Sequence, residues 1–167
     1  MDIWLLLLQE MQSSLDQIND WQSDGHKVVF TNGVFDILHV GHLHCLESAK
    51  ALGTKLIVAV NDDDSVRRLG KANDRPINTE LDRARLVSAL ECVDLVIIFS
   101  EDTPLEVVKM IKPEVLVKGG DYDAKCEDTN NPTYIVGSNE VRSAGGEVHS
   151  IPLLGGHSTT NILKNRS

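Results

Sequence analysis

The sequence predicts an α/β protein built on a mostly parallel, five-stranded sheet. Short apolar runs of strand length alternate along the chain with segments whose apolar residues repeat at helical spacing. This alternation is typical of βαβ units, in which the strands run parallel and the helices cover the sheet. The 167 residues are close to the size of one ordinary domain. We therefore expect a single domain over 1–167, with an N-terminal helical segment at 1–24 and a catalytic core at 25–167.

The elements follow from changes in the period of the apolar residues. A helix is expected at 2–22, where Leu15 and Ile18 belong to a helical stripe that Gly25 ends. The expected strands lie at 27–31, 56–60, 95–99, 115–117 and 147–151. The helices that alternate with them are expected at 41–52, 63–69, 79–90, 104–111, 134–144 and 158–164.

Composition excludes several classes of partner. Sixteen basic against twenty-five acidic residues give a net charge of −9, which argues against a nucleic-acid-binding face. The apolar run at 4–8 is too short to cross a bilayer and lacks the features of a signal peptide, so we expect no membrane insertion. The three cysteines form no Cys-x-x-Cys pair and indicate a cytoplasmic protein.

The most informative residues follow the first expected strand, because parallel sheets bind ligands beyond the carboxyl ends of their strands. The segment at 31–42 reads TNGVFDILHVGH and contains neither GxGxxG nor a phosphate-loop motif. His39 and His42 lie three residues apart, so they share one face of a first helical turn. Gly41 lets a ligand approach the backbone closely. Free N–H groups and the helix dipole complete a predicted polyphosphate site.

Two other interpretations of these histidines stay open at this point. His39, His42 and His44 are close enough in sequence to suggest a metal site. However, His44 points elsewhere on a helix, and no acidic or cysteine ligand joins the same face nearby. The other alternative is a pair of histidines at a helix start with no function.

The HVGH sequence after GVFD resembles the HxGH signature of the nucleotidylyltransferase superfamily. The second superfamily signature is a helix start rich in serine and threonine near the C-terminus, and GHSTT at 156–160 resembles it. Its hydroxyl and N–H groups would form a second anion site, although a lone Ser-Thr-Thr is usually only a helix cap. The resemblance implies a three-layer, Rossmann-like nucleotidylyltransferase fold.

Further segments resemble one branch of that superfamily, the heptose 1-phosphate adenylyltransferases. They are NDDDSVRRL at 61–69, RPIN at 75–78, Arg83, ECVD at 91–94, FSEDTP at 99–104 and VKGGDY at 117–122. The resemblance is collinear over roughly 15–165. Members of this branch are often fused to a sugar kinase, for which 167 residues leave no room, so we expect a separate kinase to supply the sugar 1-phosphate. The resemblance also implies a homodimer.

The resemblance, together with position after a strand, implies a set of site residues. The expected catalytic residues are His39, His42 and Lys118. Expected nucleotide-binding residues are Thr31, Asn32, Gly33, Phe35, Asp36, Gly41, Asn61, Arg75, Gly119, Ser158, Thr159 and Thr160. Expected substrate-binding residues are Lys71, Lys118 and Asp121. Mg²⁺ is expected to enter with ATP and to be held by phosphates and water rather than by a protein cage.

Several of these residues have a structural alternative. Lys118 has the alternative of a solvated surface lysine, although two glycines follow it. Asp121 suits a Gly-Gly-Asp turn. Lys71 and Arg75 are candidates for a lid over the phosphates and equally for surface charges. Asp36 is a candidate to orient a histidine or the nucleotide, or simply to cap the helix.

The chain also departs from the branch pattern. Val34 and His157 stand where members of the branch often have cysteine, and His157 adds a donor near the expected phosphates. The stretch at 125–133 is longer than in the bifunctional enzymes. We expect it to be an exposed loop that reshapes the acceptor pocket.

The expected reaction transfers AMP from ATP to a heptose 1-phosphate and releases pyrophosphate, giving the ADP-heptose of lipopolysaccharide biosynthesis. One alternative is a cytidylyltransferase that makes a CDP-alcohol such as CDP-glycerol. The arginine that those enzymes carry before Ser-Thr-Thr is missing from 153–157. A further alternative, from another class, is a nucleotide-binding module without catalysis.

Overall fold

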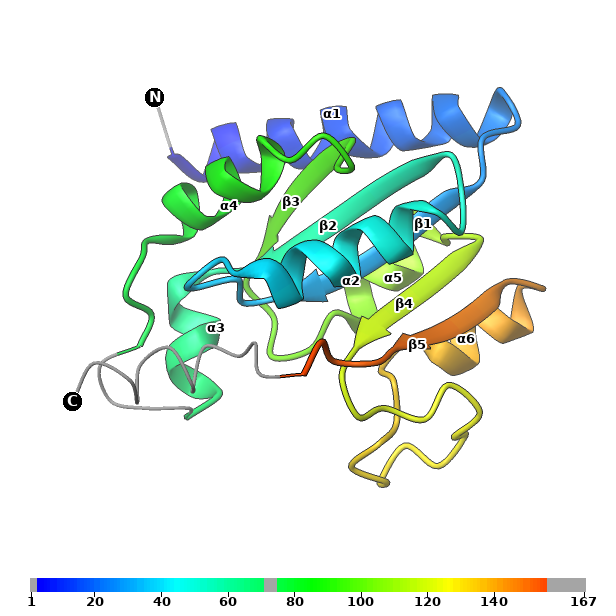
Figure 1. The fold of residues 1–167 in the computed structure, drawn as a ribbon. Helices are drawn as coiled ribbons and strands as arrows, with labels where there is room; N and C mark the ends of the chain where they lie inside the picture. The colour runs from blue at the N-terminus through cyan, green and yellow to red at the C-terminus, as the bar shows by residue number, and fades with distance from the viewer. Residues whose placement is uncertain (1–2, 71–74, 156–167) are drawn as a thin grey trace.

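The computed structural model describes residues 3–70 and 75–155, with the backbone alone described for 3–10. Helices and strands alternate as the sequence predicts (Figure 1). In chain order they are α1 (Ile3–Ser23), β1 (Val28–Gly33), α2 (Val40–Lys50), β2 (Lys55–Asn61), α3 (Asp63–Arg68), α4 (Glu80–Ser88), β3 (Leu95–Phe99), α5 (Leu105–Ile111), β4 (Val115–Gly119), α6 (Ser138–Ser143) and β5 (Glu147–Ile151).

The five strands form one sheet in the order β3-β2-β1-β4-β5. Every pairing is parallel, which confirms and sharpens the prediction of a mostly parallel sheet. The first strand lies in the centre, where Thr31 pairs with Val58 of β2 and Val117 of β4. Because the chain order reverses on either side of β1, the loops after β1, β2 and β4 meet at one edge, as at the switch point of doubly wound sheets.

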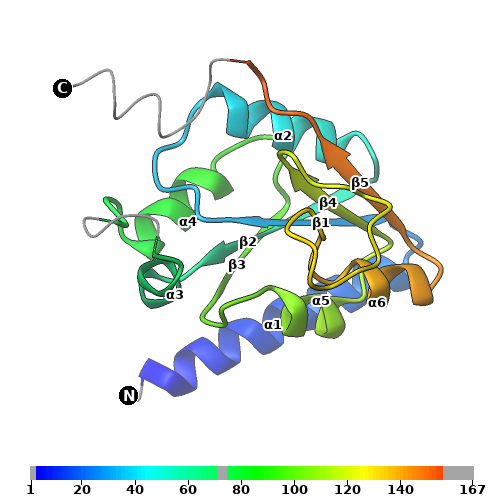
Figure 2. The same ribbon diagram turned by 90° about the horizontal axis from the view of Figure 1, so that it is seen from below.

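Helices cover both faces of the sheet, which confirms the three-layer arrangement. Helices α1, α5 and α6 lie on one face, and α2 and α4 lie on the other (Figure 2). Side chains alternate along a strand, so Phe30 packs toward α1, α5 and α6 while its neighbour Val29 packs toward α2 and α4. Burial on both faces explains why these strands read as continuous apolar runs.

The N-terminal helix packs on the core. Ile18 of α1 is only 1% exposed. Gln22, at the end of the same helix, donates from Nε2 to the Lys112 carbonyl and to Glu114 Oε1, both at 3.1 Å. Glu114 Oε2 in turn accepts from the Val28 N–H of β1 at 2.9 Å. Among the described helices, none is long and apolar enough to cross a membrane.

The strands differ from prediction mainly at their carboxyl ends. Strands β1, β2 and β4 continue to Gly33, Asn61 and Gly119, beyond the last apolar residue of each predicted run. Parallel pairing with buried neighbours keeps these polar or glycine residues in the ladder, and it places them at the edge where ligands bind.

The sixth helix is the clearest correction to the predicted elements. The predicted helix at 134–144 begins only at Ser138. Gly137 precedes it with φ of 91°, a left-handed conformation that a helix interior does not contain. Tyr134 and Ile135 are therefore free to line a cavity. The predicted helix at 158–164 lies outside the described residues.

The contact between α2 and β4 leaves no room for a side chain at Gly119. A Cβ atom there would lie 2.6 Å from the Cys45 sulfur. We expect Gly119→Ala to lower the free energy of unfolding by about 1–3 kcal/mol, as overpacking does. Adding Cys45→Ala should recover part of the loss, because it removes the sulfur. Urea unfolding of wild type, both single variants and the double variant measures the coupling; strictly additive changes would contradict this packing.

Candidate functional site

A cavity of about 250 Å³, lined by both polar and apolar side chains, lies at the carboxyl edge of the sheet. Its lining comes from the ends of β1, β2 and β4 and from the loops that follow β3 and β4. The lining residues include Asn32, Gly33, Asn61, Asp102, Thr103, Lys118, Tyr122 and Tyr134. A larger groove of about 860 Å³ runs along edge strand β3 between α1 and α4, but its lining is mainly apolar and includes none of the predicted site residues. The chemistry of the smaller cavity makes it the candidate site.

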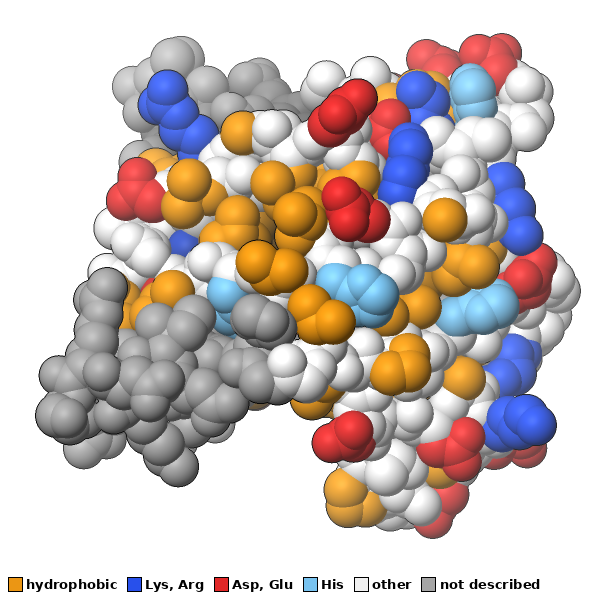
Figure 3. All heavy atoms as spheres, viewed as in Figure 1, with side chains coloured by type: hydrophobic (Ala, Val, Ile, Leu, Met, Phe, Trp, Pro, Cys, Tyr) orange, Lys and Arg blue, Asp and Glu red, His pale blue; other side chains and the backbone are white. Residues whose placement is uncertain are grey.

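The histidine pair begins helix α2 beside this edge. His39 is the N-cap, and its Nδ1 accepts from the His42 backbone N–H at 3.3 Å. The two imidazole rings stack with centroids 3.8 Å apart and planes 21° apart. The shared face that the three-residue spacing predicts is therefore confirmed. Histidine side chains lie across the surface that carries α2 (Figure 3). Gly41 belongs to the same first turn.

A glycine and a phenylalanine support the histidine pair from below. Phe35 is 8% exposed and has φ of 52°, an uncommon conformation for a large side chain. Its ring lies 5.2 Å from the His42 ring at an angle of 60°. A Cβ on Gly33 would lie 3.0 Å from the Phe35 ring, so the absence of a side chain there admits the ring. These contacts give Gly33 and Phe35 a structural role; contact with nucleotide stays a prediction for both.

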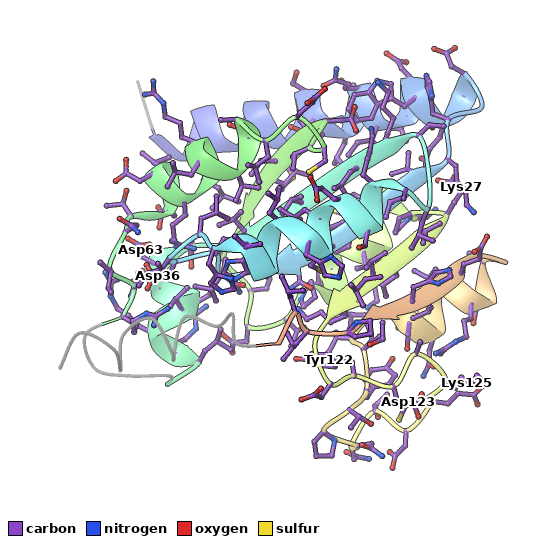
Figure 4. All side chains as sticks on the ribbon, in the orientation of Figure 1. Lys27, Asp36, Asp63, Tyr122, Asp123 and Lys125 are labelled. Atoms are coloured by element: carbon purple, nitrogen blue, oxygen red, sulfur yellow. The ribbon has the colours of Figure 1, made fainter. Side chains whose placement is uncertain are left out.

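The Asp36 carboxylate is completely buried and fully engaged within the protein. It forms an ion pair with Arg75, and its oxygens accept from the Ile77 and Asn78 backbone N–H groups at 2.9–3.0 Å. Burial alone would raise the pKa of Asp36, but these hydrogen bonds and the Arg75 charge outweigh it and hold the pKa below its usual value. Figure 4 labels Asp36 together with Asp63, the first residue of α3. The predicted residues Asp36 and Arg75 are thus brought together, as a pair that joins two loops.

Arg83 is a central residue of the site, although the sequence pattern predicts no role for it. Its side chain is 0% exposed, on the inner face of α4. The guanidinium donates to the Asn78 carbonyl at 3.0 Å, the Val34 carbonyl at 2.6 Å and Asp63 Oδ1 at 2.8 Å. The available signal was its spacing, because Arg83 lies four residues before buried Val87 on an amphipathic helix.

Lys118 is held inside the cavity. Its Nζ donates to the Asn32 carbonyl and to Asn32 Oδ1, each at 3.0 Å, and lies 5.7 Å from the centre of the Tyr122 ring. The alternative of a solvated surface lysine is therefore wrong. A compact ammonium group anchored at the end of β4 is well suited to bind a phosphate oxygen.

The other predicted residues are distributed unevenly. Asn61 is 4% exposed at the end of β2 and lines the cavity, as predicted from its position. Thr31 lies deeper in β1 and is 2% exposed, so its hydroxyl is buried beneath the edge. Asp121 is exposed and follows Gly120, in keeping with the turn alternative. Lys71, His157, Ser158, Thr159 and Thr160 lie outside the described residues.

The acidic run after β2 caps a helix. Asp62 is the N-cap of α3, and its side chain accepts from the Ser65 backbone N–H at 2.7 Å. Asp63 and Asp64 follow in the first turn, where negative charge suits the helix dipole. Within 3–70 and 75–155, no three histidine, cysteine or acidic side chains gather as metal ligands would.

The pairing of Asp36 predicts a pH-dependent contribution to stability. We expect Asp36→Ala to lower the free energy of unfolding by about 3–5 kcal/mol near pH 7, because it leaves Arg75, whose side chain is only 13% exposed, without its partner. A depressed pKa stabilises the fold fully above the ordinary aspartate pKa of about 4, and this stabilisation is lost as the pH falls through the folded-state pKa. The difference between the two proteins should therefore shrink below pH 4 in urea unfolding. A difference that grows on acidification would contradict the assignment.

A second prediction concerns Arg83. Arg83→Met should cost about 3 kcal/mol or more, because it removes a fully buried charge and leaves three partly buried acceptors without their donor. Arg85→Met is the matched control, since Arg85 lies on the exposed face of the same helix. We expect the control to change the free energy of unfolding by less than about 0.5 kcal/mol. Chemical denaturation measures both variants. Equal losses in their free energy of unfolding would contradict the structural role assigned to Arg83.

Comparison with known proteins agrees with this geometry. Residues 30–165 match the model of the cytidylyltransferase-like family. The chain is 48% identical over 147 residues to the bifunctional protein HldE of Coxiella burnetii (strain Dugway 5J108-111), covering 88% of this chain and 29% of that protein. It is 47% identical over 156 residues to the bifunctional protein HldE of Hyphomonas neptunium, covering 93% of this chain and 30% of that protein. The chain thus spans less than a third of the length of these relatives.

Solved structures show the same fold. The lipopolysaccharide core biosynthesis protein of Thermoplasma volcanium matches with a TM-score of 0.58 and 32% identity over 77% of this chain and 97% of that one. Pantothenate synthetase of Thermus thermophilus, at 17% identity and a TM-score of 0.50, shares the fold over 77% of this chain and 56% of its own. The family predicted from the HVGH and GHSTT segments is confirmed: the chain belongs to the cytidylyltransferase-like family of nucleotidyltransferases.

Proposed function

We propose that the chain transfers AMP from ATP to a heptose 1-phosphate and releases pyrophosphate, giving ADP-heptose. The observation that carries the proposal is that the 32–35 segment connects two groups suited to phosphates. At one end Asn32 accepts hydrogen bonds from Lys118, and at the other end Phe35 contacts His42 of the stacked pair. A phosphate-binding ammonium and two imidazoles therefore flank the same short loop.

The residues on this loop suit direct transfer between two bound substrates. A sugar 1-phosphate oxygen is already anionic at neutral pH, so it attacks the α-phosphorus of ATP without activation by a protein nucleophile. The bond to the bridging oxygen breaks, and its electron pair leaves with pyrophosphate. The chain contributes position and charge stabilisation. His39 and His42 would donate to the phosphates of ATP, and Lys118 would hold the α-phosphate or the acceptor phosphate.

Mg²⁺ would enter this site with the nucleotide, screening charge on the phosphates. The buried carboxylate nearest to the histidines in sequence, Asp36, is committed to Arg75, Ile77 and Asn78. We therefore propose coordination by phosphate oxygens and water, as is usual for Mg²⁺ in nucleotide sites.

The choice of acceptor rests on two lines of support. The cavity beside Lys118 presents side-chain hydroxyl, amide and carboxylate groups, which suit the hydroxyls of a sugar; they belong to Asn61, Asp102, Thr103, Tyr122 and Tyr134. The relatives are named bifunctional protein HldE, and one solved structure is named a lipopolysaccharide core biosynthesis protein. These names, and the resemblance to heptose 1-phosphate adenylyltransferases, favour a heptose. A sugar kinase would supply the 1-phosphate.

The histidine assignment predicts a loss of turnover with little loss of fold. We expect His39→Ala and His42→Ala each to lower kcat by on the order of 100-fold, the usual cost of losing one well-placed donor to a transition state. His39→Ala should also cost about 1 kcal/mol of stability, because it removes the cap of α2. His44→Ala is the control within the same helix. Pyrophosphate release and thermal melting, measured together, test it; full turnover in both variants would contradict the assignment.

The substrate assignment is tested by pyrophosphate release from each of ATP, CTP, GTP and UTP with Mg²⁺. The acceptors are both anomers of heptose 1-phosphate and glycerol 3-phosphate. Release with ATP and a heptose 1-phosphate is the expected result. Release with CTP and glycerol 3-phosphate would overturn the substrate in favour of a cytidylyltransferase. Nucleotide binding without release for any acceptor would favour a non-catalytic module.

A further inference from the structure

We propose that Arg142 of α6 is a positioning residue for the acceptor, because it clamps the 120–137 loop that forms one wall of the cavity. The inference rests on the proposed function and adds the residue that sets the geometry of the acceptor side. The loop includes the stretch at 125–133, which is longer than in the bifunctional enzymes.

The two ends of the loop both supply tyrosines to the cavity. Tyr122 lies near its start and Tyr134 near its end, and both line the cavity next to Lys118. The Asp123 N–H donates to the Thr133 carbonyl at 2.9 Å, which joins the residues next to the two tyrosines. Displacement of one end of the loop would therefore move both aromatic walls.

Arg142 connects the loop to the helix that follows it. One nitrogen, Nη2, donates to the Ala124 carbonyl and, at 3.4 Å, to the Cys126 carbonyl. The other, Nη1, donates to Ser138 Oγ and Asn139 Oδ1, both at 3.2 Å. The planar guanidinium thus spans the loop and the first turn of α6, a geometry that a lysine ammonium does not reproduce.

The clamp holds the backbone close to Tyr122, which faces the acceptor side of the cavity. The centre of the Tyr122 ring lies 5.7 Å from Lys118 Nζ. Ala124, whose carbonyl Arg142 holds, is two residues away. Figure 4 shows Tyr122 at the end of β4, with Asp123 and Lys125 along the loop beyond it. Loosening the clamp would change the aromatic surface that faces the ammonium and the acceptor.

The kinetic consequence is confined to one substrate. We expect Arg142→Lys and Arg142→Met to raise the KM for the acceptor by on the order of 10-fold, because misplaced binding groups weaken positioning. The KM for ATP, and kcat at saturating acceptor, should stay within about twofold of wild type, since the histidine turn is untouched. A role in overall folding alone would instead change both KM values, or lower the amount of active enzyme.

Two further variants make the test specific. Tyr122→Leu should reproduce the rise in acceptor KM while leaving the hydrogen bonds of Arg142 intact. It therefore tests whether the wall of the cavity sets the acceptor KM even if the Arg142 variants fold poorly. Lys109→Met is the control: it removes a positive charge from neighbouring α5, where Lys109 pairs with Glu106 at 2.8 Å. We expect no change in either KM for the control.

Limited proteolysis in the absence of substrate measures how firmly Arg142 holds the loop. Lys125 lies within the loop, so trypsin cleavage after it reports how firmly the loop is held. Cleavage there should be faster in Arg142→Met than in wild type or Lys109→Met. Faster cleavage with an unchanged acceptor KM would overturn the proposed role in acceptor positioning.

The panel of acceptors separates this inference from the proposed function. If wild type turns over glycerol 3-phosphate instead of a heptose 1-phosphate, the proposed substrate fails, and the Arg142 variants are measured with glycerol 3-phosphate. If wild type turns over a heptose 1-phosphate and the acceptor KM of the variants is unchanged, only the inference fails. A wild-type chain that releases pyrophosphate with none of the acceptors overturns both.

Discussion

Two loops at the carboxyl edge of the sheet are held together by the buried Asp36 carboxylate and the buried Arg83 guanidinium. Asp36 reaches forward along the chain to Arg75 and Ile77, and Arg83 reaches back to the Val34 carbonyl. A buried charge is strongly destabilising unless nearby groups satisfy it. Movement of either loop would therefore leave a buried charge without its partners. The first turn of α2, which carries His39 and His42 (the histidine turn), directly follows the loop that contains Val34 and Asp36. Its position is therefore fixed before any ligand binds, as catalysis by positioning requires.

The sheet supplies the second half of the same arrangement. Because β1 is central and parallel to both neighbours, Asn32 lies beside the end of β4 and receives Lys118. Gly119 lets α2 approach β4 closely, against Cys45. Histidines from one helix and a lysine from a neighbouring strand thus reach one edge without a long flexible segment between them. The strand order therefore places a positive charge and two imidazoles at the site, even though the protein as a whole carries a net charge of −9.

Much of this could be predicted from the sequence, because strand order and helical periodicity are local signals. The apolar runs located all five strands, and the residues after them located His39, His42, Asn61 and Lys118. What sequence patterns could not supply are pairings across long separations. The contact of Asp36 with Arg75 spans 39 positions, and no spacing rule encodes it. The late start of α6 depends on the left-handed Gly137, and Arg142 acquires its partners only once the loop before it has folded back.

We propose that the chain acts by holding two phosphates in line, with no covalent link between nucleotide and protein. The stereochemical course at the α-phosphorus tests this most directly. With a single diastereomer of ATP carrying sulfur at the α-phosphate, and the acceptor that the enzyme uses, direct transfer predicts inversion of configuration in the product. Retention would require two successive displacements through a nucleotidyl-enzyme intermediate and would contradict the account.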